Sequence, residues 1–549
     1  MGTKLMPRCV NFPVTTFLSI YINPHCIFFS TTDPTKLGSD SKIVTDFSCY
    51  RNFSRMTKLF MSCSHRIILF KINAFSAYII YLLSLSCVGF GLLKASKPRT
   101  DDFTPRNIDL FYTSVSAATI SSMSAVEMEA FSNAQLVVMT FLMFVGGEIF
   151  VSMLRVHLNA FKVTRKLRVV KVHDETGTLS HQDFDDESLK YDSIRFLGWV
   201  VLGYVVVVQT IGIASVLIYL GLVSGAKNVV RNKGIKRLTF VVFTVVSSFA
   251  SCGFVPTNEN MVVFKEYSGL LLILIPQLLL GNTLFPAALR GVLWSGRRNN
   301  MAKYLLRSSG MEIGYMDLLP GLHCVLLVAT VFGFLSIGFA FFSSMEWNNA
   351  GLDGLNTYQK VVAIFFQCAN ARHAGETIVD LSTIAPAILV FFVLLMYLPP
   401  YTSFLPIEKD EQITSKCEGK ERRRNTIIQT FIFSQLSYLV IFIILICITE
   451  RKSLKEDPLN FSVLNITLEV ISAYGNVGFT TGYSCDRQLR ADPKCVNKWY
   501  GFSGKWSDED GYVACMSEMS IYVDEKLMCM IMKMRCGKIS SHDRWRAGS

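Results

Sequence analysis

Long apolar blocks separated by polar stretches dominate the chain from residue 72 onwards. A helix that crosses about 30 Å of hydrocarbon needs about 20 predominantly apolar residues, and these blocks are long enough. The pattern therefore predicts membrane-spanning helices at 72–93, 134–158, 196–223, 268–294, 318–342, 384–405 and 427–448.

The stretches between these blocks alternate between two kinds. Basic linkers follow the second, fourth and sixth blocks, at 162–192, 295–317 and 409–424. The other blocks are followed by a polar lead-in, an apolar piece of about 12–15 residues and a turn of small residues. So short a piece suits a re-entrant half-helix rather than a span. A unit of span, half-helix, turn and span therefore recurs four times along the chain.

The four turns lie at 121–127, 250–256, 370–376 and 474–480. Irregular backbone at membrane depth persists only where it is buried in protein or lines water, so four such turns indicate a shared aqueous pore. Rings of backbone carbonyl groups that replace a hydration shell form cation filters, and glycine lets the chain turn its carbonyls toward the axis. Alignment on the small residue that ends each half-helix predicts a filter of Ser124, Gly253, Gly375 and Gly478.

Acidic residues follow the turns closely and are candidates for the outer mouth, where they would raise the local cation concentration. They are Glu127, Glu129, Glu259, Glu376 and Asp380. Two simpler interpretations stay open for each of them, namely pairing with a lysine or arginine and solvation of a loop.

Glu148 lies inside the second predicted span, about 15 Å from its cytoplasmic end. An intramembrane carboxylate is a functional candidate by default. The alternative is a structural pair with a basic residue of a neighbouring helix.

Composition and charge narrow the function further. Of 549 residues, 51% are apolar and 17% charged, against about 25% charged in soluble proteins. The net charge of +12 lies mostly in short basic runs beside apolar segments, which is typical of cytoplasmic loops rather than of a nucleic-acid-binding face. One basic loop, 227–237, would lie outside. We find no catalytic cluster, so we expect neither an enzyme nor a cofactor.

The turn sequences Ser-Ser-Met-Ser-Ala-Val-Glu-Met-Glu (121–129), Ser-Cys-Gly-Phe-Val-Pro-Thr-Asn-Glu-Asn-Met (251–261), Ala-Arg-His-Ala-Gly-Glu (371–376) and Tyr-Gly-Asn-Val-Gly-Phe-Thr-Thr-Gly-Tyr-Ser-Cys (474–485) carry a resemblance. They resemble the four filter segments of the plant high-affinity potassium transporter (HKT) family, within the wider Trk/Ktr/HKT group. The resemblance implies an all-α polytopic membrane protein with four membrane–pore-loop–membrane repeats around a central pore. In this family a serine at the first filter position goes with sodium-preferring transport.

The resemblance therefore implies passive sodium transport through the filter, with Na⁺ or K⁺ bound only transiently. Two alternatives remain, a potassium-permeable or sodium–potassium symporting member of the family and an inactive truncated form. The expected partners are monovalent cations and the lipid bilayer of the plasma membrane. A homodimer is compatible with this plan, and no nucleic acid is expected.

The repeat also predicts domain boundaries. These are a poorly ordered N-terminal extension, 1–55; repeat A, 56–161, with pore loop 107–132; a cytoplasmic linker, 162–192; repeat B, 193–294, with pore loop 234–260; a linker and repeat C, 295–408, with pore loop 356–380; a linker and incomplete repeat D, 409–510, with pore loop 463–484; and an aberrant tail, 511–549. The longest uncharged stretch of the tail, 511–517, is far short of the about 20 residues of a span. We therefore expect the eighth transmembrane helix to be missing or aberrant.

Overall fold

The computed structural model describes residues 74–99, 105–173, 181–308, 310–402, 435–489 and residue 502. All of them belong to one compact unit, Asn73–Ser549, and the other unit, Met1–Ile72, lies outside the described residues. The described ranges consist of helices joined by loops, without a strand, which confirms the all-α prediction there. The predicted extension 1–55, the tail 511–549 and the position of an eighth helix also lie outside the described residues.

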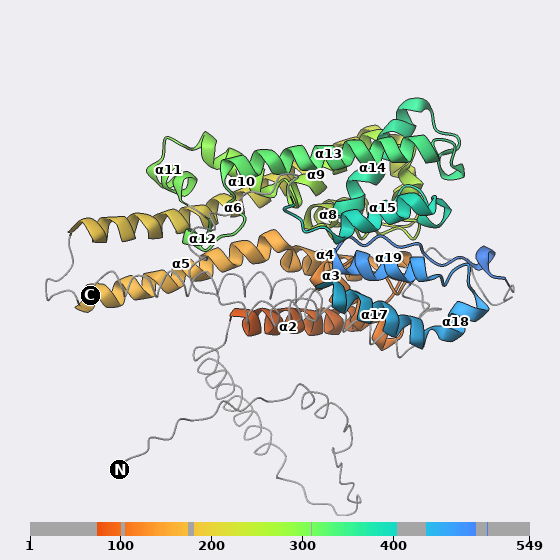
Figure 1. Ribbon diagram of the computed structural model, residues 1–549, viewed down its shortest axis with the longest axis horizontal. Helices are drawn as coiled ribbons and strands as arrows, with labels where there is room; N and C mark the ends of the chain where they lie inside the picture. Colours follow the sequence, from red (N-terminus) through yellow and green to blue (C-terminus); the bar gives the residue numbers. More distant parts are fainter. Residues whose placement is uncertain are drawn as a thin grey trace, which may run out of the picture. The chain divides into compact units, whose positions relative to one another are not determined.

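The described helices repeat one plan four times, and we name the copies units A to D. Each unit opens with an apolar helix. These are α2 (Ala74–Ala95), α6 (His181–Leu222), α13 (Gly321–Glu346) and α17 (Gln435–Thr449) (Figure 1). Within the described part of the chain, α2, α6 and α13 each contain a stretch long and apolar enough to cross a membrane alone. Several apolar side chains on α6 and α13 are exposed, among them Ile218 and Leu322, as expected of surfaces that face lipid.

A shorter helix follows in each unit, as the repeat predicts. These half-helices are α3 (Asn107–Thr119), α8 (Arg237–Ala250), α14 (Thr357–His373) and α19 (Val463–Tyr474). The start of α14 is fixed by reciprocal hydrogen bonds between Asn356 and Gln359, which satisfy backbone donors that a helix start leaves open.

An irregular loop leaves each half-helix and ends in a 3₁₀ turn. The turns are η2 (Met128–Ala130), η4 (Asn260–Phe264), η6 (Leu381–Thr383) and η8 (Cys485–Arg487). We define loop A as 120–130, loop B as 251–264, loop C as 374–383 and loop D as 475–487, so that each loop includes its turn.

The helices that close units A and B are bent, where the sequence predicts single straight spans at 134–158 and 268–294. α4 (Asn133–Gly146) and α5 (Glu148–His173) meet at 53°, and α9 (Ser268–Gly281) and α10 (Phe285–Ser295) meet at 81°. With each bent pair counted as one span, the described residues hold up to five spans. Unit C closes with the short helix α15 (Pro386–Tyr397).

Close packing against the half-helices accounts for the position of both bends. A Cβ at Gly146 would overlap the carbonyl oxygen of Ala118 in α3, and a Cβ at Gly281 would overlap that of Phe249 in α8. In both units a glycine therefore lets the closing helix touch the end of the half-helix, and the closing helix breaks directly after that glycine.

Smaller helical segments connect the units. They are α7 (Ser224–Asn232), α11 (Asn300–Arg307), α12 (Gly310–Ile313), η5 (Ala350–Leu352) and α18 (Arg451–Glu456).

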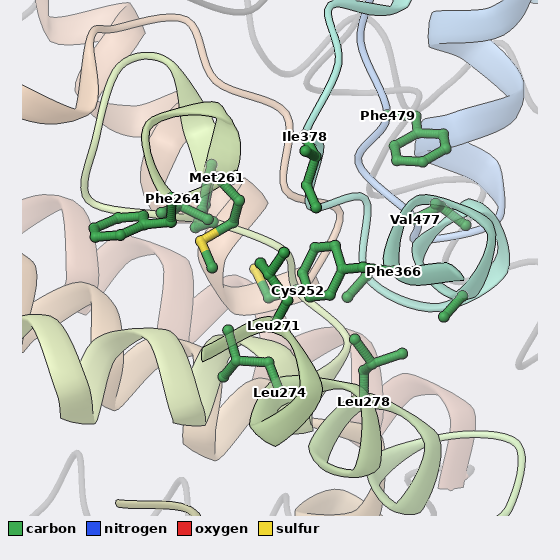
Figure 2. Packing of buried hydrophobic residues seen from close by; sticks show 14 of the residues in the cluster. Cys252, Met261, Phe264, Leu271, Leu274, Leu278, Phe366, Ile378, Val477 and Phe479 are labelled. Atoms are coloured by element: carbon green, nitrogen blue, oxygen red, sulfur yellow. The ribbon is translucent and has the colours of Figure 1, made fainter. Parts of the chain in front are cut away.

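The largest apolar core contains residues of loops B, C and D and of the helices on which these loops pack (Figure 2). Cys252 of loop B, Ile378 of loop C and Phe479 of loop D are fully buried in it, together with Leu274 of α9 and Phe366 of α14. Because these side chains pack on helices of two units, the same core positions three loops.

Candidate functional site

Three of the loops contain a glycine with left-handed backbone conformation. The φ angle is 81° at Gly253, 67° at Gly375 and 86° at Gly478. In loop A the serine Ser122 takes the same conformation, with φ of 62°. Residues with a Cβ seldom adopt this region, so the four loops share an unusual local geometry.

Backbone carbonyl groups converge at these positions. A Cβ added to Gly253 would overlap the carbonyl oxygen of Ala374, and a Cβ added to Gly375 would overlap that of Val477. Ala374 and Val477 directly precede a left-handed glycine in their own loops. No side chain fits at Gly253 or Gly375, and the space is occupied by carbonyl oxygens from the neighbouring loop.

Ser122 completes this arrangement in loop A. Its hydroxyl lies where a Cβ of Gly478 would stand, and it is 3.2 Å from the position of a Cβ on Gly253. Loop A therefore contacts both loop B and loop D through Ser122. We call Ser122, Gly253, Gly375 and Gly478 the loop ring.

The three glycines expected in the filter lie close together. The serine of loop A that meets them is Ser122 rather than Ser124. Ser124 lies two residues further along loop A, and its hydroxyl donates to the carbonyl oxygen of Val126 at 2.5 Å. Two serines compete in the alignment, because either is small enough to end the half-helix. Gly253 and Gly478 are each followed by Phe, and Ser122 is followed by Met but Ser124 by Ala. That pattern is the signal that favours Ser122.

A cavity of about 330 Å³ adjoins the ring, and we call it the outer cavity. Ser122, Gly253 and Gly478 line it, as does Ser124. Its wall also carries charged side chains, namely Glu259, Asp380 and Arg487. Polar groups of both signs therefore surround the approach to the ring.

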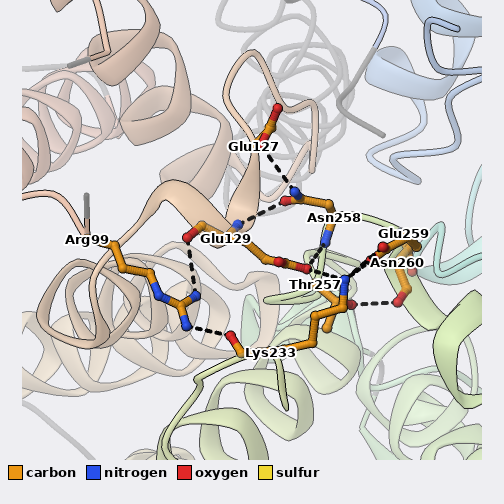
Figure 3. A network of polar contacts seen from close by, with 8 residues as sticks. All are labelled: Arg99, Glu127, Glu129, Lys233, Thr257, Asn258, Glu259 and Asn260. Carbon is orange, nitrogen blue, oxygen red and sulfur yellow. Dashed lines mark hydrogen bonds and ion pairs between the residues drawn. The ribbon is translucent and has the colours of Figure 1, made fainter. Parts of the chain in front are cut away.

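Two of the predicted outer-mouth carboxylates are paired with one lysine. Lys233 Nζ lies 2.7 Å from Glu129 Oε1 and 2.6 Å from Glu259 Oε2 (Figure 3). Glu127 accepts a hydrogen bond from the side-chain amide of Asn258 at 3.2 Å. The simpler interpretation of pairing with a basic residue is thus correct for Glu129 and Glu259.

Lys233 belongs to the basic loop that the charge pattern placed outside. Burial acts to lower the pKa of Lys233, but hydrogen bonds to Glu129 and Glu259 and their negative charges outweigh it, so the pKa is raised above the usual value. Its ammonium group therefore stays charged and joins loops A and B.

Glu376 does not lie at the outer mouth, contrary to the sequence-based expectation. It is fully buried, and its Oε1 accepts a hydrogen bond from Ser248 of α8 at 2.5 Å. Within the described residues its Oε2 has no hydrogen-bond partner. Proximity to Gly375 in sequence suggested the mouth, but the loop turns this side chain inward behind the ring.

Asp380 behaves differently, since it lines the outer cavity and also accepts a hydrogen bond from the backbone N–H of Ser382 at 2.9 Å.

The sequence analysis missed a second buried carboxylate, Glu469 of α19. It is fully buried and accepts a hydrogen bond from the Thr480 hydroxyl, two residues after Gly478. A lone acidic residue within an apolar half-helix is the signal that could have identified it.

Glu148 starts α5 at the bend and lines a separate cavity of about 40 Å³. Arg372 of α14 lines the same cavity and donates hydrogen bonds to the carbonyl oxygens of Leu395 at 2.8 Å and Pro399 at 2.5 Å. Arg372 thereby holds the chain where α15 ends. A role of Glu148 in ion passage stays a prediction.

Sequence comparison matches residues 176–499 to the model of the TrkH family, described as a cation transport protein. The chain is 46% identical over 465 residues to the probable cation transporter HKT1;4 of Oryza sativa subsp. japonica, which covers 79% of this chain and 92% of that protein. It is 48% identical over 444 residues to the sodium transporter HKT1 of Arabidopsis thaliana, which covers 77% of this chain and 87% of that protein.

Among solved structures, the potassium transporter TrkH from Vibrio parahaemolyticus aligns with 84% of this chain and 85% of its own, with a TM-score of 0.48 and 12% sequence identity.

Proposed function

The chain belongs to the plant HKT branch of the TrkH family of cation transport proteins, and from this we propose that it conducts sodium passively through the loop ring. It is a membrane protein that transports cations. The proposal concerns the preferred ion and the place where it is selected.

The convergence of carbonyl groups at the ring carries this proposal. The carbonyl oxygens of Ala374 and Val477 lie against the neighbouring glycines of the ring. A cation that passes there exchanges water oxygens for backbone oxygens, which is how carbonyl filters compensate for dehydration.

The side chain of Ser122 supports the preference for sodium over potassium. At this position the other three loops have only a hydrogen, whereas loop A has a hydroxymethyl group that contacts the ring at Gly478. A narrower ring with one side chain penalises the larger K⁺ more than Na⁺, whether through cavity size or through the field of the coordinating oxygens. The HKT1 protein of Arabidopsis thaliana is named as a sodium transporter, which agrees with this preference.

The outer cavity supports cation entry. Glu259 and Asp380 place carboxylates on its wall, and Arg487 and the nearby Lys233 balance them. The electrostatic field in the outer cavity is therefore moderate. Such a field suits a cation that must bind weakly enough to leave.

The proposal includes the plasma membrane as the location of the protein. Flux measurements on the full chain test it. Intact cells that express the chain are first surface-labelled, and then sodium and potassium fluxes and the reversal potential are measured. We expect a sodium current that reverses at the sodium equilibrium potential. Absence of cation flux at confirmed surface expression would overturn the proposed function, and equal sodium and potassium permeabilities would overturn the sodium preference.

A further inference from the structure

Loop B makes direct hydrogen bonds to loop A through Asn258. The Asn258 Oδ1 accepts from the backbone N–H of Glu129 at 2.9 Å, and the backbone N–H of Asn258 donates to Glu129 Oε1 at 3.1 Å. Its side-chain amide donates to Glu127 Oε2 (Figure 3). Asn258 thus holds loop A by both backbone and side chain.

Two residues later, Asn260 makes the equivalent connection to loop C. Its Oδ1 accepts from the backbone N–H of Thr377 at 3.2 Å, and the backbone N–H of Met261 donates to the Thr377 carbonyl oxygen at 3.1 Å. Thr377 lies two residues after Gly375 of the ring. This contact crosses from unit B to unit C.

The backbone conformation of Asn260 favours this contact. Its φ angle is 55°, in the left-handed region that asparagine tolerates better than most side chains. The Thr257 hydroxyl donates to the Asn260 carbonyl oxygen at 2.6 Å (Figure 3). The turn is therefore closed internally, and Asn260 Oδ1 accepts both from the N–H of Met261 in loop B, at 2.8 Å, and from loop C.

Loop C depends on side-chain acceptors where it leaves the ring. The backbone N–H groups of Glu376, Thr377 and Ile378 donate to the side-chain oxygens of Asn370, Asn260 and Gln367 respectively. Asn370 and Gln367 belong to the half-helix of unit C, so of these three bonds only that of Asn260 ties the segment to another unit. Glu376 and Ile378 are fully buried and Thr377 is partly buried, and backbone donors shielded from water are costly to leave unpaired.

We propose that the segment 257–260 of loop B sets the spacing of loops A and C around the ring, which makes Asn258 and Asn260 positioning residues for cation selection. This inference rests on the proposed function of the ring. Within the described residues, neither asparagine makes a hydrogen bond to a ring residue. Both act through loops that each contribute one residue to the ring. Small displacements of these loops change the distances between carbonyl oxygens, on which discrimination between ions of different size depends.

Substitutions at Asn260 separate its side chain from its backbone. Asn260→Gly removes the side-chain acceptor of the Thr377 and Met261 N–H groups, of which that of Met261 retains the Thr377 carbonyl oxygen, and it keeps the left-handed turn, which glycine adopts without strain. Asn260→Asp keeps an acceptor oxygen on the same side chain. We expect the potassium-to-sodium permeability ratio, taken from reversal potentials, to rise about threefold to tenfold in the glycine variant, the range that corresponds to loss of one hydrogen bond. The aspartate variant should restore the ratio to within about twofold of wild type.

The reversal potential does not depend on how many molecules reach the surface, so a merely structural loss of protein would leave the ratio unchanged. If Asn260→Gly does not reach the surface, Thr257→Val provides the test, because it removes only the hydroxyl that closes the turn. We expect it to shift the permeability ratio in the same direction. A wild-type ratio in whichever of these variants reaches the surface would overturn the inference. A wild-type chain without cation flux would overturn the proposed function, and the inference with it.

Discussion

The hydroxyl of Ser122 in loop A occupies the space that a Cβ of Gly478 in loop D would need, although the two residues lie more than three hundred positions apart. This relationship makes Ser122 the one ring position with a side chain. It also locates the residue on which ion preference should depend.

Replacement of Ser122 by glycine should make the ring uniform and widen it. We expect the potassium-to-sodium permeability ratio of Ser122→Gly to rise about tenfold, equivalent to about 1.4 kcal/mol. Ser124→Gly is the matched control, because it removes the same side chain two residues away, and its ratio should stay within about twofold of wild type. The opposite result, with a shift only in Ser124→Gly, would show that the ring is assigned to the wrong serine.

Side chains should not be tolerated at the glycines of the ring. At Gly375 a Cβ would overlap the carbonyl oxygen of Val477, and φ is 67°. Gly375→Ala should therefore abolish cation flux at normal surface levels. Gly291→Ala is the control, because a Cβ there meets no atom within 4 Å in the described structure. Wild-type flux in Gly375→Ala would contradict the geometry of the ring.

The buried hydrogen bond between Ser248 and Glu376 should stabilise loop C from behind. Ser248→Ala leaves the Glu376 carboxyl group without the hydroxyl donor that lies 2.5 Å away, a loss of about 1–3 kcal/mol. Thermal unfolding of the purified protein in detergent should show a lower transition temperature. Glu376→Gln retains a side-chain oxygen that can accept from Ser248, so it should unfold closer to wild type than Ser248→Ala does. A Ser248→Ala variant as stable as wild type would exclude a supporting role for this contact.

Removal of the Lys233 charge should strengthen the negative field at the outer cavity. In Lys233→Met the carboxylates of Glu129 and Glu259 lose their common partner, so we expect the sodium concentration for half-maximal current to fall about threefold at low ionic strength. The difference should shrink as an inert salt screens it. Lys227→Met removes an equal charge from an exposed position on α7, and it should have a smaller effect. Equal effects of the two substitutions would indicate that only net charge matters.

Much of the architecture could be predicted because it depends on local properties of the chain. Hydropathy identified the opening helices, and the short apolar pieces identified the half-helices. The bends after Gly146 and Gly281 could not be predicted, because they arise where these glycines meet Ala118 and Phe249 of other helices. The seven predicted spans accordingly included two that the structure breaks.

Part of the candidate site was also predictable. Gly253, Gly375 and Gly478 stand out because each lies two to four residues after a half-helix and takes a positive φ angle. The sequence pointed to Ser124, whereas Ser122 has the left-handed backbone and meets Gly478, because a serine gives no comparable conformational signal and both serines fit the same composition. Glu376 was placed at the mouth because sequence distance does not tell which way a side chain points.

The sequence by itself determined the repeated plan, the half-helices and three glycines of the ring, since periodicity and backbone preference are local. Tertiary structure alone decided which serine faces Gly478, and which group pairs with each carboxylate. The reason is distance along the chain. Ser248 and Glu376 are 128 residues apart, and Glu129 and Asn258 are 129 apart. Such contacts depend on how the four units pack against one another. The sequence of a single segment does not determine that packing.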